Sequence, residues 1–489
     1  MGVNKIKNNG EVFTPTHIVD DMLALVSYNP NYEKQNVYEI YENIFMKHII
    51  DNSCGDGAIL ERVVINYINS FIRINKDICG LSEHLSKYIH GIEIDPDNHK
   101  KCIDRLNSIE FHVPGVEEMY KVLDINVNWD IKCADALTIT EYDNKMDYVI
   151  GNPPYVRIHN LQNKKILKKY MFCNEGMTDL YLAFFELSFR QLNNDGKMAF
   201  ITPNSWLTSN AAQLLREYIR ENKNLIKLVD FGHYQVFEGI TTYSLISIFN
   251  KSKNYEVKCY GVNPDDGEVY SEPLYNINYA NLFINNHIYI CSEKEREIIF
   301  KVMREANNKQ FRVKNGFATL ADNIFIKKLP YDLEYEIPVY KASTGEIASC
   351  IYPYDINGKP FTEEEFKEKS PHNYNYLLEN KDKLLNRSIK NKDEWYLFGR
   401  TQAINDVEKD KISVPSIIKN QEDFIKKLKK VPCGCGVYGG IYILGDYNIV
   451  IEKLSSPDFL AYIKSLRKYK NGGYYTFSSK DLEKYLNNY

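Results

Sequence analysis

Four short apolar segments in the first third of the chain each run into a polar side chain, and this series constrains the fold more than any other feature. In parallel sheets the carboxyl ends of the strands meet at one edge, where ligands bind. The series therefore predicts an α/β fold with a mainly parallel, Rossmann-like sheet and a site along one edge. The segments are 48–50 before Asp51, 91–92 before Glu93, 131–133 before Asp135, and 148–150 before Asn152.

The last of these segments breaks at the sequence Gly-Asn-Pro-Pro-Tyr, residues 151–155. Each proline fixes its own φ and restricts the residue before it, so Asn152 is expected to be extended and stiff. The Asn152 amide oxygen and the Pro153 carbonyl then form two rigid acceptors beside the Tyr155 ring. That arrangement suits a flat substrate carrying an amino group, although a Pro-Pro turn with a packed tyrosine would have the same local sequence.

The segment from Asp51 to Gly57 indicates a strand, a glycine-rich loop and a helix. Glycines there let a ligand approach the N–H groups of a helix N-terminus. The loop lacks the Gly-Lys-Ser/Thr sequence that cradles phosphates. The acid that opens it, Asp51, favours a ligand that is a zwitterion with an amino group, or a ribose. Glu93 at the end of the second strand has the usual position of a ribose acceptor. The long connection before it, with residues 73–87, predicts an inserted helical segment.

The α/β pattern continues to about residue 250 and stops at the polar stretch 250–254. We therefore expect a first domain at 1–254 and a second at 255–489. In the first, Thr14 and Pro15 indicate a helix start, and Thr178 is expected to cap another helix over 178–187. Strands are expected at 198–203 and 225–231, with a closing hairpin over 236–249. In the second domain, helices are expected at 292–305 and 456–469.

The second domain is rich in tyrosine and lysine and is expected to be α+β. Basic residues interleaved with aromatic residues favour a nucleic-acid surface, although solvated lysines over an ordinary core would give a similar pattern. The basic residues are Lys381, Lys383, Arg387, Lys390 and Lys392, then Lys426, Lys427, Lys429 and Lys430, then Lys464, Arg467, Lys468 and Lys470. The aromatic residues are Trp395, Tyr396, Phe398, Tyr474, Tyr475 and Phe477.

Composition narrows the class of protein further. The net charge of −4 argues against a uniformly basic coat and leaves room for a basic cleft. No apolar run approaches the ~20 residues of a membrane span, and no secretory signal is evident. The ten cysteines lack paired spacing, which favours a reducing cytoplasm. Neither the cysteines nor the histidines have the spacing of a metal site, so we expect no metal.

Four motifs in order resemble the gamma class of S-adenosylmethionine-dependent DNA adenine-N6 methyltransferases of bacterial restriction–modification systems. They are Phe13–Pro15, Asp51–Gly57, Gly91–Pro96 and Asn152–Tyr155. The resemblance covers about residues 9–250. Looser similarity to the target-recognition half of such enzymes extends over 315–322, 395–402 and 472–477. The resemblance implies a Rossmann-like methyltransferase domain followed by a DNA target-recognition domain.

The resemblance also implies roles for individual residues. Thr14 and the loop residues Asp51, Ser53, Cys54, Gly55 and Gly57 would lie at the methionine end of the cofactor, and Asn152 would also contact the cofactor. Glu93 would hold the ribose, Ile94 would pack on the adenine and Asp135 would bind its amino group, while Ala136 replaces a bulkier ring that often packs there. Asn152, Pro153, Pro154, Tyr155 and Phe237 would form the catalytic pocket, with Tyr155 and Phe237 stacking on either side of the base. Arg157, Trp395, Arg400, Tyr474 and Tyr475 are our candidates for contacts to DNA.

The resulting hypothesis is a site-specific DNA methyltransferase that is adenine-specific and uses S-adenosyl-L-methionine. It would methylate N6 of an adenine flipped out of double-stranded DNA. We expect a cytoplasmic monomer without membrane contact, beside which a cognate restriction endonuclease would act separately. Two alternatives stay open at this stage. One is methylation of protein glutamine or RNA, and the other is a DNA-specificity subunit without catalysis.

Overall fold

The computed structural model of the chain describes residues 14–27, 44–113, 115, 119–158, 165–176, 178–237, 243–304, 309–327, 335–389 and 391–489. It separates into two compact units, Met1–Ile290 and Cys291–Tyr489. Phe13, from the first of the four motifs, and Lys390, from the first basic group, lie outside the described residues.

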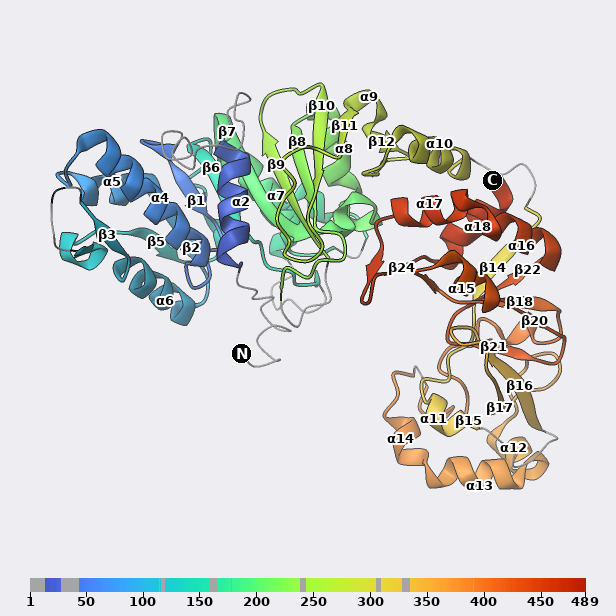
Figure 1. Cartoon of the computed structure of the whole chain (residues 1–489). Helices are drawn as coiled ribbons and strands as arrows, with labels where there is room; N and C mark the ends of the chain where they lie inside the picture. The colour runs from blue at the N-terminus through green and yellow to red at the C-terminus, as the bar shows by residue number, and fades with distance from the viewer. Residues whose placement is uncertain are drawn as a thin grey trace. The chain divides into compact units, whose positions relative to one another are not determined.

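The described part of the first unit is built on a nine-stranded sheet with the order β11-β10-β8-β9-β7-β6-β1-β2-β5 (Figure 1). All neighbours are parallel except at β9, which is antiparallel to both β7 and β8, and at β11, which is antiparallel to β10. In chain order the strands are β1 (Ile49–Asp51), β2 (Ile89–Glu93), β5 (Asp130–Cys133), β6 (Met146–Gly151), β7 (Leu192–Pro203), β8 (Leu225–Asp230), β9 (Ser244–Asn250), β10 (Glu256–Gly261) and β11 (Tyr275–Asn278).

Alternate strand residues contribute to two separate hydrophobic cores, one on each side of the sheet. Ile49, Tyr148 and Ile150 pack with the first core, and Ile50 and Val149 pack with the second. The period of two follows from the pleat of a strand, and burying each such side chain stabilises the fold by about 1.5–3 kcal/mol. The first core includes residues of α2 (Thr16–Ser27), α4 (Ala58–Asn75), α5 (Leu81–Tyr88) and α6 (Pro96–Asn107), and the second includes residues of α7 (Tyr181–Gln191) and α8 (Gln213–Asn222).

The predicted fold class is confirmed, and several local predictions can be compared with the structure. The connection before β2 is helical as predicted, because α5 occupies Leu81–Tyr88. Thr178 does not cap a helix, since α7 begins at Tyr181 without a side-chain cap. The predicted closing hairpin over 236–249 is also wrong. Its described strand, β9, inserts between β7 and β8 instead.

The predicted domain boundary at 254/255 falls between β9 and β10, inside the sheet. Because β10 pairs in parallel with β8 and carries β11, both strands belong to the first unit, which extends to Ile290. Small elements complete this unit: β3 (Glu110–His112), β4 (Met119–Lys121), α9 (Tyr279–Leu282), β12 (Phe283–Ile284) and β13 (His287–Ile288).

The second unit mixes short strands and helices, as predicted. Within its described residues one sheet has the order β14-β22-β18-β20, another β15-β17-β16-β21 and a third β19-β24-β23. The strands are β14 (Arg312–Asn315), β15 (Ile326–Lys327), β16 (Glu336–Lys341), β17 (Ile347–Ile351), β18 (Lys411–Val414), β19 (Ile417–Ile418), β20 (Lys429–Val431), β21 (Gly436–Tyr438), β22 (Ile441–Leu444), β23 (Tyr469–Lys470) and β24 (Tyr474–Thr476).

The helices of the second unit are short. The two predicted helices are present but end earlier than expected, as α10 and α17. The set is α10 (Glu293–Val302), α11 (Asp322–Phe325), α12 (Glu363–Lys369), α13 (Pro371–Glu379), α14 (Lys381–Leu385), α15 (Gln421–Lys426), α16 (Tyr447–Ser455), α17 (Pro457–Ser465) and α18 (Ser479–Asn488). Across the part of the chain that the structure describes, every helix is too short or too polar to span a bilayer.

Candidate cofactor and substrate site

The ends of β1, β2, β5 and β6 lie along one edge of the sheet. The register pairs Asp51 with Gly91 and Glu93 with Cys133, so these strand ends are in step. β1 ends at Asp51 and β2 at Glu93, while Asp135 and Asn152 follow the ends of β5 and β6. The sheet therefore brings the polar residues of the four predicted segments to a common edge.

Asp51 is the most deeply buried acid of this edge, with 1% of its surface exposed. Its Oδ1 accepts a hydrogen bond from the Ser53 backbone N–H (3.1 Å). Burial raises the pKa of Asp51 to about 7, and the negative charge of Glu93 adds to the effect. A buried acid poised in this way favours a nearby cation, because a positive group stabilises the ionised carboxylate.

Two backbone N–H groups hold the Glu93 carboxylate, one from the glycine-rich loop and one from the residue two positions after Glu93. One carboxylate oxygen accepts from Gly55 N–H (2.8 Å) and the other from Asp95 N–H (2.8 Å). These bonds join the glycine-rich loop to the end of β2 and fix the carboxylate orientation. The next residue, Ile94, exposes 66% of its surface. An ordered carboxylate beside an exposed aliphatic side chain offers a polar and an apolar contact in adjacent positions.

The glycine-rich loop requires a glycine at position 57. Gly57 has φ +87°, and a Cβ there would lie 2.8 Å from the Cys102 sulfur. Cys54 is also buried, and its hydrogen bond with Cys102, together with burial, raises the pKa of the Cys54 thiol well above its usual value. The buried thiols of Cys54 and Cys102 thus pack behind the loop, where they act as small apolar side chains.

Asp135 begins a short 3₁₀ helix, Ala136–Thr138. Its side chain accepts from the Leu137 N–H (3.0 Å), which orients the carboxylate at the end of β5. Ala136 is buried with 5% exposed, so the small residue is part of the packing rather than a surface platform.

Asn152 is connected to the start of α2 across 138 residues of sequence. Its Nδ2 donates to Oγ1 of Thr14 (3.2 Å), and Thr14 is itself buried. This bond sets the orientation of the amide, with the nitrogen toward Thr14 and the oxygen away from it. Pro153 is buried and Pro154 is half-buried, so the loop that carries Asn152 is packed as well as conformationally restricted.

The two predicted stacking rings lie together, but in an edge-on arrangement. The Tyr155 and Phe237 ring centroids are 6.5 Å apart at 63°, and Phe237 is 4% exposed. The Tyr155 hydroxyl donates to the Ile201 carbonyl (2.9 Å), and Tyr181 packs edge-on against the same ring at 6.4 Å. A base held between Tyr155 and Phe237 would need two parallel faces, which this geometry does not provide. The sequence did not predict the contact between Tyr181 and Tyr155, because no sequence pattern links two aromatic residues 26 positions apart.

Arg157 is exposed two positions after Tyr155, where the backbone forms an isolated bridge with Asp179. The bridge ties the loop after Pro154 to the segment before α7. Arg157 therefore presents a cation close in sequence to the substrate loop.

The prediction that Trp395 contacts DNA is wrong, because only 2% of its surface is exposed and its ring packs on Tyr374 and Tyr396. Arg387, from the first basic group, is 6% exposed and donates to the carbonyls of Thr319, Leu397 and Trp395. Most of the interleaved aromatics, namely Trp395, Tyr396, Phe398 and Phe477, belong to the interior.

Three DNA-contact candidates remain accessible in the second unit. Arg400 is exposed, while its backbone pairs with Ala318 in both directions (2.9 and 3.2 Å). Tyr474 and Tyr475 are half-buried in β24, which forms a hairpin with β23. Lys419 donates to Gly472 in the hairpin turn (2.8 Å) and lies 5.8 Å from the Tyr474 ring centroid.

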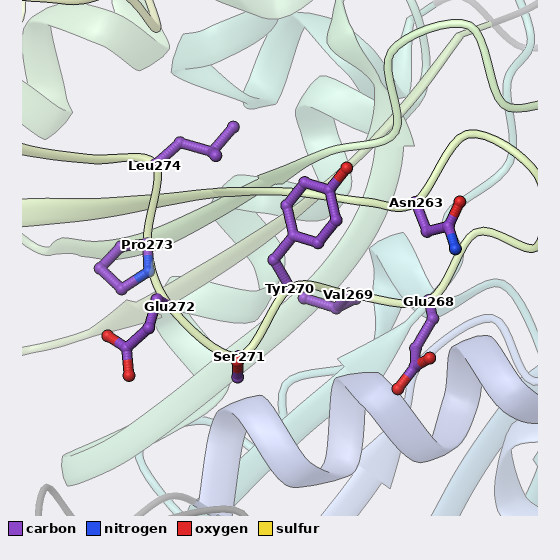
Figure 2. Close-up of a pocket in the computed structure, with 8 residues that line it drawn as sticks. All are labelled: Asn263, Glu268, Val269, Tyr270, Ser271, Glu272, Pro273 and Leu274. Carbon is purple, nitrogen blue, oxygen red and sulfur yellow. The ribbon is translucent and has the colours of Figure 1, made fainter.

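A hollow of about 380 Å³ is lined by residues of the connection from β10 to β11 rather than by the motif residues. Its lining residues include Glu268, Tyr270 and Glu272 (Figure 2). Since β10 is parallel to β8, the connection after β10 leaves the sheet at the same edge as the predicted site. Two carboxylates and none of the predicted site residues line the hollow, so we do not assign the cofactor to it.

Comparisons with known proteins are consistent with this geometry. Residues 72–237 match the family model described as Eco57I restriction-modification methylase. The Type II restriction enzyme and methyltransferase RM.Eco57I of Escherichia coli is 24% identical, over 84% of this chain and 49% of that protein. The Type II methyltransferase M.BstVI of Geobacillus stearothermophilus is 25% identical, over 79% of this chain and 74% of that protein. The chain thus spans about half the length of the first of these relatives.

Among solved structures, the Type IIL restriction-modification enzyme MmeI in complex with DNA has a TM-score of 0.65 with 16% identity. The match covers 98% of this chain and 68% of that chain, and it concerns the fold. The family model and the two curated relatives confirm the predicted resemblance to methyltransferases of restriction–modification systems.

Proposed function

We propose that this chain transfers a methyl group from S-adenosyl-L-methionine to the exocyclic N6 of an adenine flipped out of double-stranded DNA. The observation that carries the proposal is the position of Asn152. Two prolines hold this residue at the end of β6, at the same sheet edge as Asp51 and Glu93, and its amide donates a hydrogen bond to Thr14. The similarity to restriction–modification methylases supports the same reaction class.

The residues along the sheet edge fit this cofactor. The ordered Glu93 carboxylate suits ribose hydroxyls, and the exposed Ile94 side chain beside it suits a flat adenine face. The buried Asp51 suits the positive amino group of the methionine part. Gly57 lets the loop backbone lie close to α6, because a side chain at this position would collide with Cys102. When bound, the cofactor supplies an electrophilic methyl group on a sulfonium.

The role of Asn152 follows from the electronic structure of adenine. The lone pair of the amino nitrogen is delocalised into the ring, which makes this nitrogen a poor nucleophile. Acceptance of its two N–H groups by the Asn152 oxygen and the Pro153 carbonyl would favour a tetrahedral nitrogen with a localised lone pair. Rigid acceptors serve this purpose best, because they need no reorganisation during the reaction.

Tyr155 would supply the stacking face for the flipped base, with the ring held by its bond to the Ile201 carbonyl. A base–aromatic stack contributes roughly 1–3 kcal/mol, which offsets part of the cost of unstacking the base from the duplex. Phe237 touches Tyr155 edge-on, so we assign it to support of the Tyr155 ring. We propose the second unit, with Arg400, Tyr474 and Tyr475, as the part that recognises the DNA target.

Methyl transfer from radiolabelled S-adenosylmethionine tests the proposal directly. Purified chain is incubated separately with unmethylated DNA, total RNA and a mixture of proteins, and each product is digested and analysed by mass spectrometry. We expect label in DNA as N6-methyladenine. Label as a methylated cytosine would overturn the adenine assignment, and label confined to RNA or protein would overturn the DNA assignment. Absence of transfer with retained DNA binding would support a non-catalytic specificity subunit.

A further inference from the structure

Leu320 is an exposed apolar residue whose backbone conformation is unfavourable. Its φ of +59° lies in the left-handed region, which is unfavourable for a residue with a branched aliphatic side chain. At the same time 40% of its surface is exposed, so burial of the side chain does not fully account for this conformation. Residues held in such strained conformations cluster at functional sites, where the surrounding structure keeps them in place.

The surrounding structure holds this conformation in place. Thr319 is fully buried, and its hydroxyl donates to Asp322 (2.5 Å) and accepts from the Ala321 N–H (3.0 Å). The buried Arg387 guanidinium donates to the Thr319 carbonyl (2.5 Å). The residue before Leu320 is therefore fixed by its side chain and by its carbonyl.

The same arginine positions the neighbouring segment. Arg387 also donates to the carbonyls of Leu397 and Trp395, which lead into Arg400. Backbone bonds between Ala318 and Arg400 join the two segments directly. At Gly399 a side chain would collide with Leu320, so the two segments are in close contact there. Leu320 and Arg400 are thus exposed side chains on adjoining, mutually fixed segments.

We propose that Leu320 and Arg400 form a rigid pair for base recognition, in which Leu320 contacts the methyl group of a thymine beside the base or phosphate contacted by Arg400. The inference rests on the proposed DNA methylation. The thymine C5-methyl is the apolar group that the major groove presents, and it is recognised by apolar contact. Because Leu320 packs partly on Gly399, it presents a shallow apolar tip, which suits a methyl group better than insertion between base pairs.

The test replaces thymines by deoxyuridine, which removes only the C5-methyl group. The target sequence is first determined by mapping methylated adenines in DNA from cells that express the chain. Each thymine of that sequence is then replaced in turn, and the affinity of the full chain for each duplex is measured. For the wild-type chain we expect one position where affinity falls about fourfold, the value of one buried methyl group.

Two variants of Leu320 separate recognition from structure. Leu320→Ala should bind the thymine and deoxyuridine duplexes equally at that position. Leu320→Gly should do the same while melting at or above the wild-type temperature, because glycine is unstrained at positive φ. The matched control is Leu378→Ala on α13, where a leucine is 43% exposed, and it should retain the wild-type preference for thymine.

The outcomes distinguish this inference from the proposed function. A wild-type chain that methylates DNA but shows no sensitivity to any thymine replacement overturns the Leu320 contact alone. Leu320 variants that keep the thymine preference, with or without a loss of thermal stability, also overturn it. A wild-type chain that methylates no DNA overturns the proposed function, and this inference with it.

Discussion

The sheet edge of the first unit and the Leu320–Arg400 region of the second unit both contain residues predicted from sequence, but they hold them differently. At the sheet edge, Asp51 and Glu93 stand at strand ends and are bonded to backbone N–H groups. In the second unit, Arg387 and Trp395 from the same basic and aromatic pattern are buried, whereas Arg400 is exposed. A motif at a strand end predicts where its side chains lie, because the backbone of the sheet fixes their positions. A pattern of residue types does not predict which side chains face solvent.

The strongest test of the sheet edge is Asn152→Ala. Methyl transfer in a single turnover should fall about a hundredfold to a thousandfold, the usual cost of removing one preorganised polar group from a reacting centre. Binding of cofactor and DNA should change little, because the group acts on the nitrogen as it rehybridises. Asn193→Ala is the matched control, since Asn193 bonds Asp147 near the starts of β6 and β7. A transfer rate within about threefold of wild type would remove Asn152 from the mechanism.

In the second unit, Arg387→Met should destabilise the fold by about 2–4 kcal/mol, because it leaves buried carbonyls without their donor. Chemical denaturation with urea measures this change. The exposed Arg400, replaced by alanine, should unfold at the wild-type urea concentration. Equal stability of both variants would show that burial does not separate the two arginines.

Glu93→Ala tests whether an ordered carboxylate at the sheet edge binds ligand. The affinity for S-adenosylmethionine should fall by about 1.5–3 kcal/mol, the value of hydrogen bonds to a charged group. Isothermal titration calorimetry measures this affinity, with Glu110→Ala as the control, because Glu110 is an exposed residue of β3. Unchanged affinity in a folded Glu93 variant would place the ribose elsewhere.

The smallest expected effect concerns the protonation of Asp51. Its folded-state pKa of about 7 lies above the ordinary value of 3.8, so without ligand its contribution to stability falls as pH rises between these values. A bound amino cation favours the ionised form, so cofactor affinity should rise about fivefold from pH 6 to pH 7, as the ionised fraction grows from about one tenth to about one half. Asp51→Asn should remove this pH dependence. Wild-type affinity that is flat or falls over the same range would contradict the assignment.

Much of the first unit could be predicted because local signals agreed with the global fold. The apolar runs before Asp51, Glu93 and Asn152 became adjacent parallel strands, and their register put the polar residues at one edge. The extension of the sheet by β10 and β11 could not be predicted, since β10 pairs with β8 and not with β9, the strand that precedes it in the chain. Sequence patterns report local conformation, and they do not specify which distant strand becomes a neighbour.

The sequence by itself determined which residues stand at the strand ends and that Asn152 is held by two prolines, because hydrophobic periodicity and proline stereochemistry act locally. Only the tertiary structure decided which of these residues meet, such as Asn152 and Thr14, and how the rings of Tyr155 and Phe237 face each other. It also decided that Arg387 lies inside while Arg400 lies outside. Those outcomes depend on packing between distant segments, where an arginine donates to whichever carbonyls the fold brings within its reach.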